Sequence, residues 1–239
     1  MPVKRIFVTS FILIWILTFV PSFNLMADEQ KNSESESTQT VIDVESPSAL
    51  LMEVNSGQIL YEKDGDTARR PASVTKLMTM LLAFEALDSG KLTLESVVTV
   101  SEHAASMGGS QVYLEVNEQQ TVEDILKCMI VSSANDAAVA MGEAIAGSEE
   151  AFVQMMNEKA EELGCKDTYF ITPNGLDAED ENGFHHTTAE DLCRIMAYCT
   201  WESPMKEQFL EITQTRNYAS FMNRNSYLNQ MDGVLTGKT

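Results

Sequence analysis

Basic residues are scarce in this sequence. Its 239 residues include 16 Lys and Arg against 36 Asp and Glu, which gives a formal net charge of −20. Such a chain repels a phosphate backbone, and no basic stripe offsets that repulsion. Nucleic acid is therefore excluded as an expected partner.

Cysteine and histidine are also few. The four cysteines are too irregularly spaced for a disulfide scaffold: Cys128, Cys165, Cys193 and Cys199. Neither they nor the three histidines show zinc-motif spacing. Buried thiols are the favoured interpretation. Cys193 and Cys199 would lie nearly opposite each other on one helix, which argues against a bridge between them, whereas a Cys128–Cys165 bridge stays open.

Long apolar runs are absent except near the N-terminus. Lys4 and Arg5 precede a mostly apolar run from Ile6 to Val20, and the leader ends in Asn24-Leu25-Met26-Ala27 before Asp28. This layout is typical of a secretory signal peptide and is short for a spanning helix, which needs ~20 apolar residues. We predict that residues 1–27 direct export, with an uncleaved N-terminal anchor as the alternative.

A polar segment separates this leader from the folded part. Residues 28–47 are rich in Ser, Glu and Gln, cannot offset the cost of ordering, and are predicted to be a flexible linker. The single folded domain is expected over residues 48–239, because 44% hydrophobic content is enough to bury a core.

The folded part is predicted to mix α and β. Two strands, 49–54 and 58–61, flank a tight turn, and further strands are expected at 96–100 and after Leu210. Ser73 to Asp88 is apolar on nearly every face and predicts a buried helix closed by Gly90, and other helices are expected at about 122–131, 136–146, 149–163 and 188–200. Thr188 has capping-box spacing, and His185 is expected to pack or hydrogen-bond in its loop.

Three short motifs contain side chains that could do chemistry. Ser73 and Lys76 lie about one helical turn apart on one face, which suits a nucleophile beside a base whose pKa is lowered by burial. Ser133 and Asn135 lie between two helical patterns, where a hydroxyl could relay a proton and an amide could hold a substrate carbonyl or the lysine amine. Lys238 and Thr239 could bind a substrate carboxylate. Each motif alone is explained as readily by helix capping or by a solvated chain end.

Together, the motifs resemble a known family. SxxK, SxN and KT in this order resemble the signature of penicillin-recognising serine enzymes. The surrounding blocks are similar to those of low-molecular-mass D-alanyl-D-alanine carboxypeptidases: PASVTKLMT (71–79), SANDAA (133–138), TYFITPNGL (168–176) and HHTTAEDL (185–192). The resemblance covers the chain from about Ser48 to its last residue and implies an α+β, β-lactamase/transpeptidase-like fold, with a helical cluster packed on an antiparallel sheet.

The resemblance also implies a reaction outside the bacterial cytoplasm, at the cell wall or the outer face of the membrane. Ser73 would attack the penultimate D-Ala carbonyl of a peptidoglycan stem peptide with Lys76 as base, and β-lactams would acylate the same serine. Ser133 and Asn135 would relay protons and orient the substrate, and Lys238 with Thr239 would anchor its carboxylate. No metal or cofactor is expected, and membrane association is expected only through an uncleaved N-terminus or a further C-terminal segment.

The sequence also departs from the family pattern. It stops at Thr239, where the KTG motif would continue with glycine, so we expect a chain truncated within its last strand. An inactive wall-binding fragment of the same fold is therefore one alternative. A serine β-lactamase is a second, although no ExxLN-like block follows Ser133, and an endopeptidase using the same residues is a third.

Overall fold

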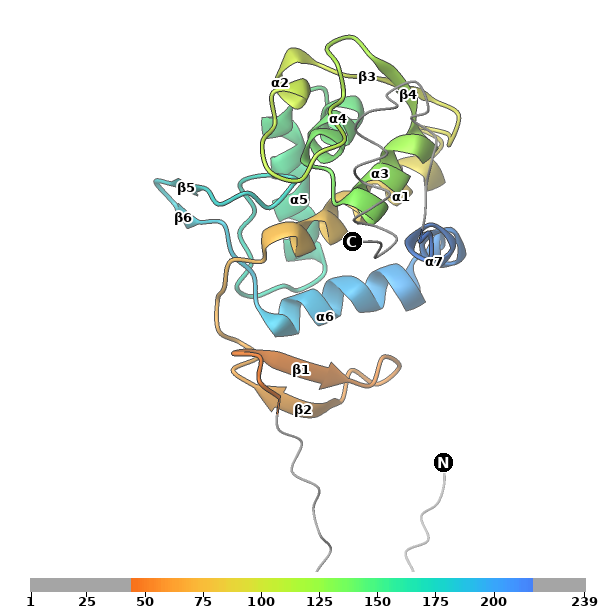
Figure 1. The fold of residues 1–239 in the computed structure, drawn as a ribbon. Coiled ribbons are helices and arrows are strands. Elements are labelled where there is room, and N and C mark those ends of the chain that lie inside the picture. Colours follow the sequence, from red (N-terminus) through yellow and green to blue (C-terminus); the bar gives the residue numbers. More distant parts are fainter. Residues whose placement is uncertain (1–43, 217–239) are drawn as a thin grey trace, which may run out of the picture. The chain divides into compact units, whose positions relative to one another are not determined.

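Helices are the main regular structure in the described part of the chain, and its strands are short (Figure 1). The computed structural model describes residues 44–216. The strands form three antiparallel pairs: β1 (Ala49–Met52) with β2 (Ile59–Lys63), β3 (Val97–Thr99) with β4 (Gln119–Thr121), and β5 (Glu179–Asp180) with β6 (Gly183–Phe184). The α-helices are α1 (Lys76–Asp88), α2 (Glu102–Ala105), α3 (Val122–Ser132), α4 (Asn135–Ala146), α5 (Glu149–Glu162), α6 (Ala189–Ala197) and α7 (Lys206–Thr213). A 3-10 turn, η1 (Ala72–Thr75), leads into α1, and a π-helical turn, η2 (Tyr198–Glu202), follows α6.

The predicted N-terminal hairpin is confirmed. Ala49 pairs with Lys63 and Leu51 with Tyr61, and the register shifts after Leu51. Gly57 takes φ +69° in the connecting turn, a conformation that glycine adopts without a steric penalty. Helix α6 packs against β1, as Figure 1 shows, so the hairpin covers one side of this helix.

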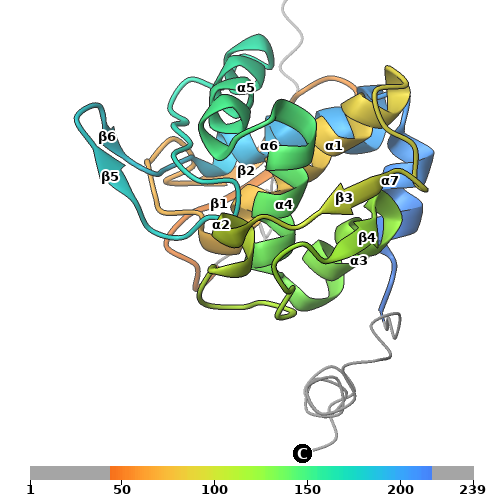
Figure 2. The same ribbon diagram turned by 90° about the horizontal axis from the view of Figure 1, so that it is seen from above.

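The core forms around α1 and α4. Helix α1 is buried on nearly every face, as its apolar sequence predicts, and α4 contacts α1, α3 and α5 (Figure 2). Phe152 of α5 is fully buried against α4 at Gly142, where an added Cβ would stand 2.8 Å from the phenylalanine ring. Burying one such large apolar side chain contributes roughly 1.5–3 kcal/mol, so this packing fixes the elements that carry the site.

Side-chain caps define where four helices begin. The side chains of Ser101, Thr121, Ser148 and Thr188 each accept a hydrogen bond from the backbone N–H three residues later. Such caps satisfy backbone donors that have no partner within the helix. The helix start predicted at Thr188 is therefore confirmed.

The strand predicted after Leu210 is wrong as far as Thr213. This segment belongs to α7, where Phe209 and Ile212, three residues apart, are both buried on one helical face. The ring of Phe209 meets Phe84 of α1 edge-on, with ring centroids 5.6 Å apart. The rest of that predicted strand lies beyond the described residues.

The four thiols are free. Cys128 and Cys199 are buried, as predicted, whereas Cys165 and Cys193 are only half-buried. The Cys128–Cys165 bridge that the sequence left open is not formed. Burial raises the pKa of Cys199 to about 12, which leaves this thiol protonated and inert.

The predicted signal peptide and residues 28–43 of the predicted linker lie outside the described residues. Between residues 44 and 216, no helix combines the length and the apolar character needed to cross a bilayer.

Candidate active site

Ser73 lies in η1, directly before the buried helix α1. Its side chain is exposed, whereas Thr75 and Lys76 are buried. Ala72, just before it, takes φ +48°, a left-handed conformation that is uncommon for a residue with a Cβ. Strain of this kind persists only where the surrounding structure fixes it, and it is frequent at functional sites.

The Lys76 amine lies at the centre of the site. It is 3.3 Å from Ser73 Oγ, and it donates to Asn135 Oδ1 at 2.7 Å and to the backbone carbonyl oxygen of Asn174 at 2.8 Å. Burial disfavours the charged ammonium and lowers the pKa of Lys76 to about 8, although the negative charge of Asp136 opposes this shift. The predicted pair of a hydroxyl and a depressed-pKa amine is therefore assembled.

Asn135 and Ser133 come from the junction of α3 and α4, as the sequence predicts. Ser133 ends α3 in a left-handed conformation (φ +53°, ψ +37°), which turns the chain sharply into α4. The Asn135 amide binds the lysine amine through Oδ1 and the carbonyl of Gly108 through Nδ2. Within residues 44–216, the Ser133 hydroxyl makes no hydrogen bond, so a relay through it stays a prediction.

Asp136, the residue after Asn135, is fully buried next to the site. It accepts hydrogen bonds from the backbone N–H groups of Val112, Leu114 and Ala137. Two of these donors lie in the segment that follows Gly108 and Gly109. Asp136 therefore anchors this segment against α4 and adds a negative charge near Lys76.

The segment from Ile171 to Gly175 packs along the first turn of α1. The Thr79 hydroxyl donates to the carbonyl of Pro173 at 2.6 Å, and Lys76 binds the next carbonyl along the chain. Gly175 takes φ +84°, and a Cβ there would stand 1.8 Å from the carbonyl oxygen of Ala72. Only glycine lets the backbone at position 175 come so close to the Ala72 carbonyl. This contact places the segment beside Ser73.

A cavity of about 360 Å³ opens beside these groups. Ser73, Lys76 and Ser133 all contribute to its wall. The rest of the wall is mostly apolar and comes from η1, α1, α3, α6, η2 and α7: Val74, Leu77, Met80, Met129, Ile130, Met196, Thr200, Phe209, Leu210 and Thr213. The three predicted residues therefore face one space that a small molecule can enter.

The structure does not place every predicted site residue. Lys238 and Thr239 lie outside the described residues, so their role as a carboxylate anchor stays a prediction. Over residues 44–216, no group of three or more His, Cys, Asp or Glu side chains is arranged to hold a metal ion.

Comparisons with known proteins show the family to which the chain belongs. A family model described as D-alanyl-D-alanine carboxypeptidase matches residues 32–239. The chain is 44% identical, over 245 residues, to the D-alanyl-D-alanine carboxypeptidase DacF of Bacillus subtilis, an alignment that covers 99% of this chain and 60% of that protein. The chain thus spans about three fifths of the length of this relative.

Solved structures show the same fold. Penicillin-binding protein 6B of Escherichia coli is similar with a TM-score of 0.67 and 34% identity, over 74% of this chain and 55% of that one. Penicillin-binding protein D2 of Listeria monocytogenes, in its ampicillin-bound form, is similar with a TM-score of 0.64 and 27% identity, over 76% of this chain and 70% of that one. The fold expected from the sequence motifs is confirmed.

Proposed function

The chain belongs to the D-alanyl-D-alanine carboxypeptidase family, and we propose that it removes the terminal D-Ala from peptidoglycan stem peptides through an acyl-enzyme on Ser73. The observation that carries this proposal is the contact between the Ser73 hydroxyl and a buried Lys76 amine. A pKa of about 8 leaves roughly one tenth of this amine neutral at pH 7, and only a neutral amine can accept a proton.

The first step is acylation. Lys76 takes the hydroxyl proton as Ser73 Oγ forms a bond to the penultimate D-Ala carbonyl carbon. The amide bond to the terminal D-Ala then breaks, and the leaving nitrogen receives a proton from the lysine ammonium. The proton is thereby returned, and Lys76 is neutral again.

The second step is hydrolysis of the ester. Water attacks the acyl carbon, its proton passes to Lys76, and the Ser73 oxygen leaves and recovers that proton. Asn135 and the carbonyl of Asn174 hold the amine in place through both steps. Because they bind it from two directions, the amine is oriented toward Ser73 before the substrate arrives.

Other groups would complete the site. The backbone N–H of Ser73, which lies in the short helix η1, is proposed to stabilise the developing oxyanion. Ser133 supplies a hydroxyl for proton transfer, and Lys238 with Thr239 supplies a cation and a hydroxyl for the terminal carboxylate. β-Lactams, which present a carboxylate and a reactive amide, are proposed to acylate the same serine. The protein is proposed to act after export, at the bacterial cell wall.

Release of D-Ala tests this proposal. The protein is incubated with a synthetic stem peptide ending in D-Ala-D-Ala, and free D-Ala is measured beside a Ser73→Ala variant. We expect release by the wild type and none by the variant. Equal release by both proteins would contradict the assignment of Ser73. Cleavage of cross-linked dimers without release from the monomeric peptide would favour an endopeptidase instead.

A further inference from the structure

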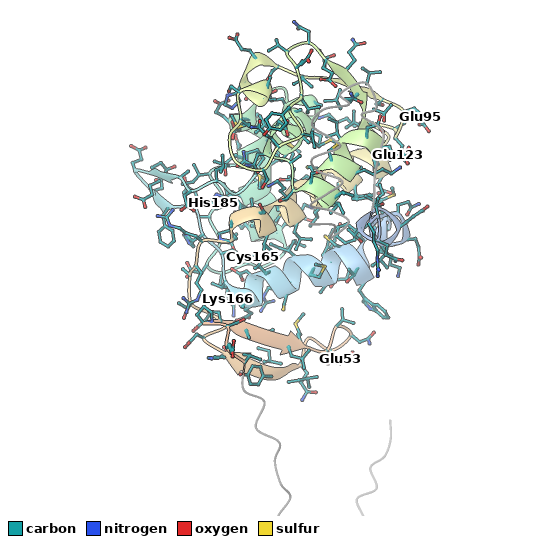
Figure 3. All side chains as sticks on the ribbon, in the orientation of Figure 1. Glu53, Glu95, Glu123, Cys165, Lys166 and His185 are labelled. Carbon is teal, nitrogen blue, oxygen red and sulfur yellow. The ribbon has the colours of Figure 1, made fainter. Side chains whose placement is uncertain are left out.

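His185 is fully buried. It lies just after β6, and Figure 3 labels it beside the N-terminal end of α1. Its Nδ1 accepts from the backbone N–H groups of Ile171 at 3.0 Å and Thr172 at 3.3 Å. Its Nε2 lies 2.8 Å from Thr75 Oγ1. The mechanism proposed above assigns this imidazole no role.

The two backbone donors determine the tautomer. Because two N–H groups point at Nδ1, this nitrogen is an acceptor, and the proton of the neutral ring lies on Nε2. Nε2–H therefore donates to the Thr75 hydroxyl. Burial lowers the pKa of His185 to about 4, and the nearby charges of His186 and Arg70 act in the same direction, against Asp177. The ring stays neutral in this tautomer over the working pH range.

The ring connects two segments that contact the Lys76 amine. On one side the ring hydrogen-bonds to the hydroxyl of Thr75, the residue directly before Lys76. On the other it holds the start of the 171–175 segment, whose Asn174 carbonyl accepts from the Lys76 amine. Besides this lysine contact, two others tie the segment to η1 and α1: Thr79 to the Pro173 carbonyl, and Gly175 against Ala72.

We propose that His185 is a positioning residue of the reaction: it holds the 171–175 segment against the Ser73–Lys76 turn, so that the lysine amine stays desolvated and aimed at the nucleophile. It touches neither substrate nor the reacting atoms. The inference rests on the proposed function, because it assigns His185 to the same site.

The test separates the two halves of the ring. In His185→Asn, the side-chain oxygen lies near the position of Nδ1 and can still accept from Ile171 and Thr172. In His185→Gln, the amide nitrogen lies near Nε2 and can still donate to Thr75. His185→Ala removes both contacts. His186→Ala is the matched control, since this neighbouring imidazole lies against Phe184, Asp167 and the ring of Tyr169 instead.

Acylation by a fluorescent penicillin is followed over a range of concentration, so that the binding constant and the acylation rate constant are obtained separately. We expect His185→Ala to lower the acylation rate constant by about ten- to a hundredfold with little change in binding. Each half-mimic should recover part of this loss, and His186→Ala should behave as wild type.

The pH profile distinguishes positioning from a merely structural role. Loosening the 171–175 segment admits water to the Lys76 amine, so the limb of the profile that follows its deprotonation should move to higher pH in His185→Ala. The same shift should appear when the pKa of Lys76 is measured directly by nuclear magnetic resonance, which needs no activity. A wild-type rate constant, or an unmoved Lys76 pKa in the folded variant, would overturn the proposal.

Failure of the proposed function and failure of the inference on His185 give different experimental results. If wild-type protein is never acylated, the proposed function fails, and the Lys76 pKa in His185→Ala still decides the role of the imidazole. If wild type is acylated and His185→Ala is acylated equally fast, the proposed function stands and the inference on His185 falls.

Discussion

Replacing Asn135 by aspartate tests whether Lys76 acts as a neutral base. The substitution keeps the shape of the side chain but places a carboxylate 2.7 Å from the lysine amine, where a neutral amide oxygen now lies. At an effective dielectric constant of about 20, a charge pair at this distance interacts by about 6 kcal/mol. Desolvation of the new carboxylate offsets part of this attraction, which leaves at least about 3 kcal/mol.

A stabilisation of about 3 kcal/mol raises the pKa of Lys76 by about two units, from about 8 to about 10. The neutral fraction at pH 7 then falls from about one tenth to about one thousandth. We therefore expect Asn135→Asp to be acylated about a hundredfold more slowly at pH 7, and to recover as the pH approaches 10.

The assay is the acylation rate constant with a fluorescent penicillin, measured from pH 6 to 10.5. Asn135→Ala is the comparison, because it removes the hydrogen bond to Lys76 without adding charge. It should lower the whole profile without moving its limb upward. The reasoning is refuted if Asn135→Asp loses activity equally at every pH, since that result would show a structural defect and not a change in the lysine pKa.

Three further predictions concern stability. Gly175→Ala should lower the free energy of unfolding by more than about 2 kcal/mol, because the added Cβ would stand 1.8 Å from a backbone carbonyl oxygen. Gly164→Ala is the control: this glycine has φ +72° but open space around it, so the substitution should cost about 1 kcal/mol. Equal losses in denaturant titrations would contradict the packing argument. The pKa of His185 is lower in the folded state than in the unfolded chain, so at acid pH the unfolded chain binds a proton that the buried ring does not take up. The free energy of unfolding should therefore fall by about 2–3 kcal/mol as pH falls from 6.5 to 4. A loss of the same size in His185→Gln would show another cause. The pKa of His103 is raised by its hydrogen bond with Glu149. The small stabilisation from this half-exposed pair should therefore be present below pH 6.5 and be lost as pH rises through the folded-state pKa of His103. A stability difference between wild type and His103→Gln that does not change with pH would refute this prediction.

Local sequence predicted the elements that carry the site. The apolar faces of α1 indicated a buried helix, and the break between two helical patterns indicated the turn at Ser133. These features depend on residues close together in the chain, and the structure confirms them. The strand predicted after Leu210 was wrong, because α7 depends on packing of Phe209 against α1, which no local pattern contains.

Contacts between distant segments were not predictable in the same way. His185 and Thr75 are 110 residues apart, and Lys76 and Asn174 are 98 apart. The sequence predicted that His185 would pack or hydrogen-bond in its loop. The ring is buried, but it hydrogen-bonds to Thr75 and to the backbone of Ile171 and Thr172, and no local pattern indicated these contacts. The anchoring role of Asp136 was missed for the same reason, since its partners come from a segment more than 20 residues away.

The most direct test of the central claim is to find the residue that penicillin modifies. Wild type, Ser73→Ala and Lys76→Ala are incubated with a fluorescent penicillin, digested and mapped by mass spectrometry. We expect one adduct on the peptide that contains Ser73, its absence in Ser73→Ala, and strongly slowed formation in Lys76→Ala at pH 7. An adduct on another residue, or undiminished labelling of Ser73→Ala, would contradict this claim.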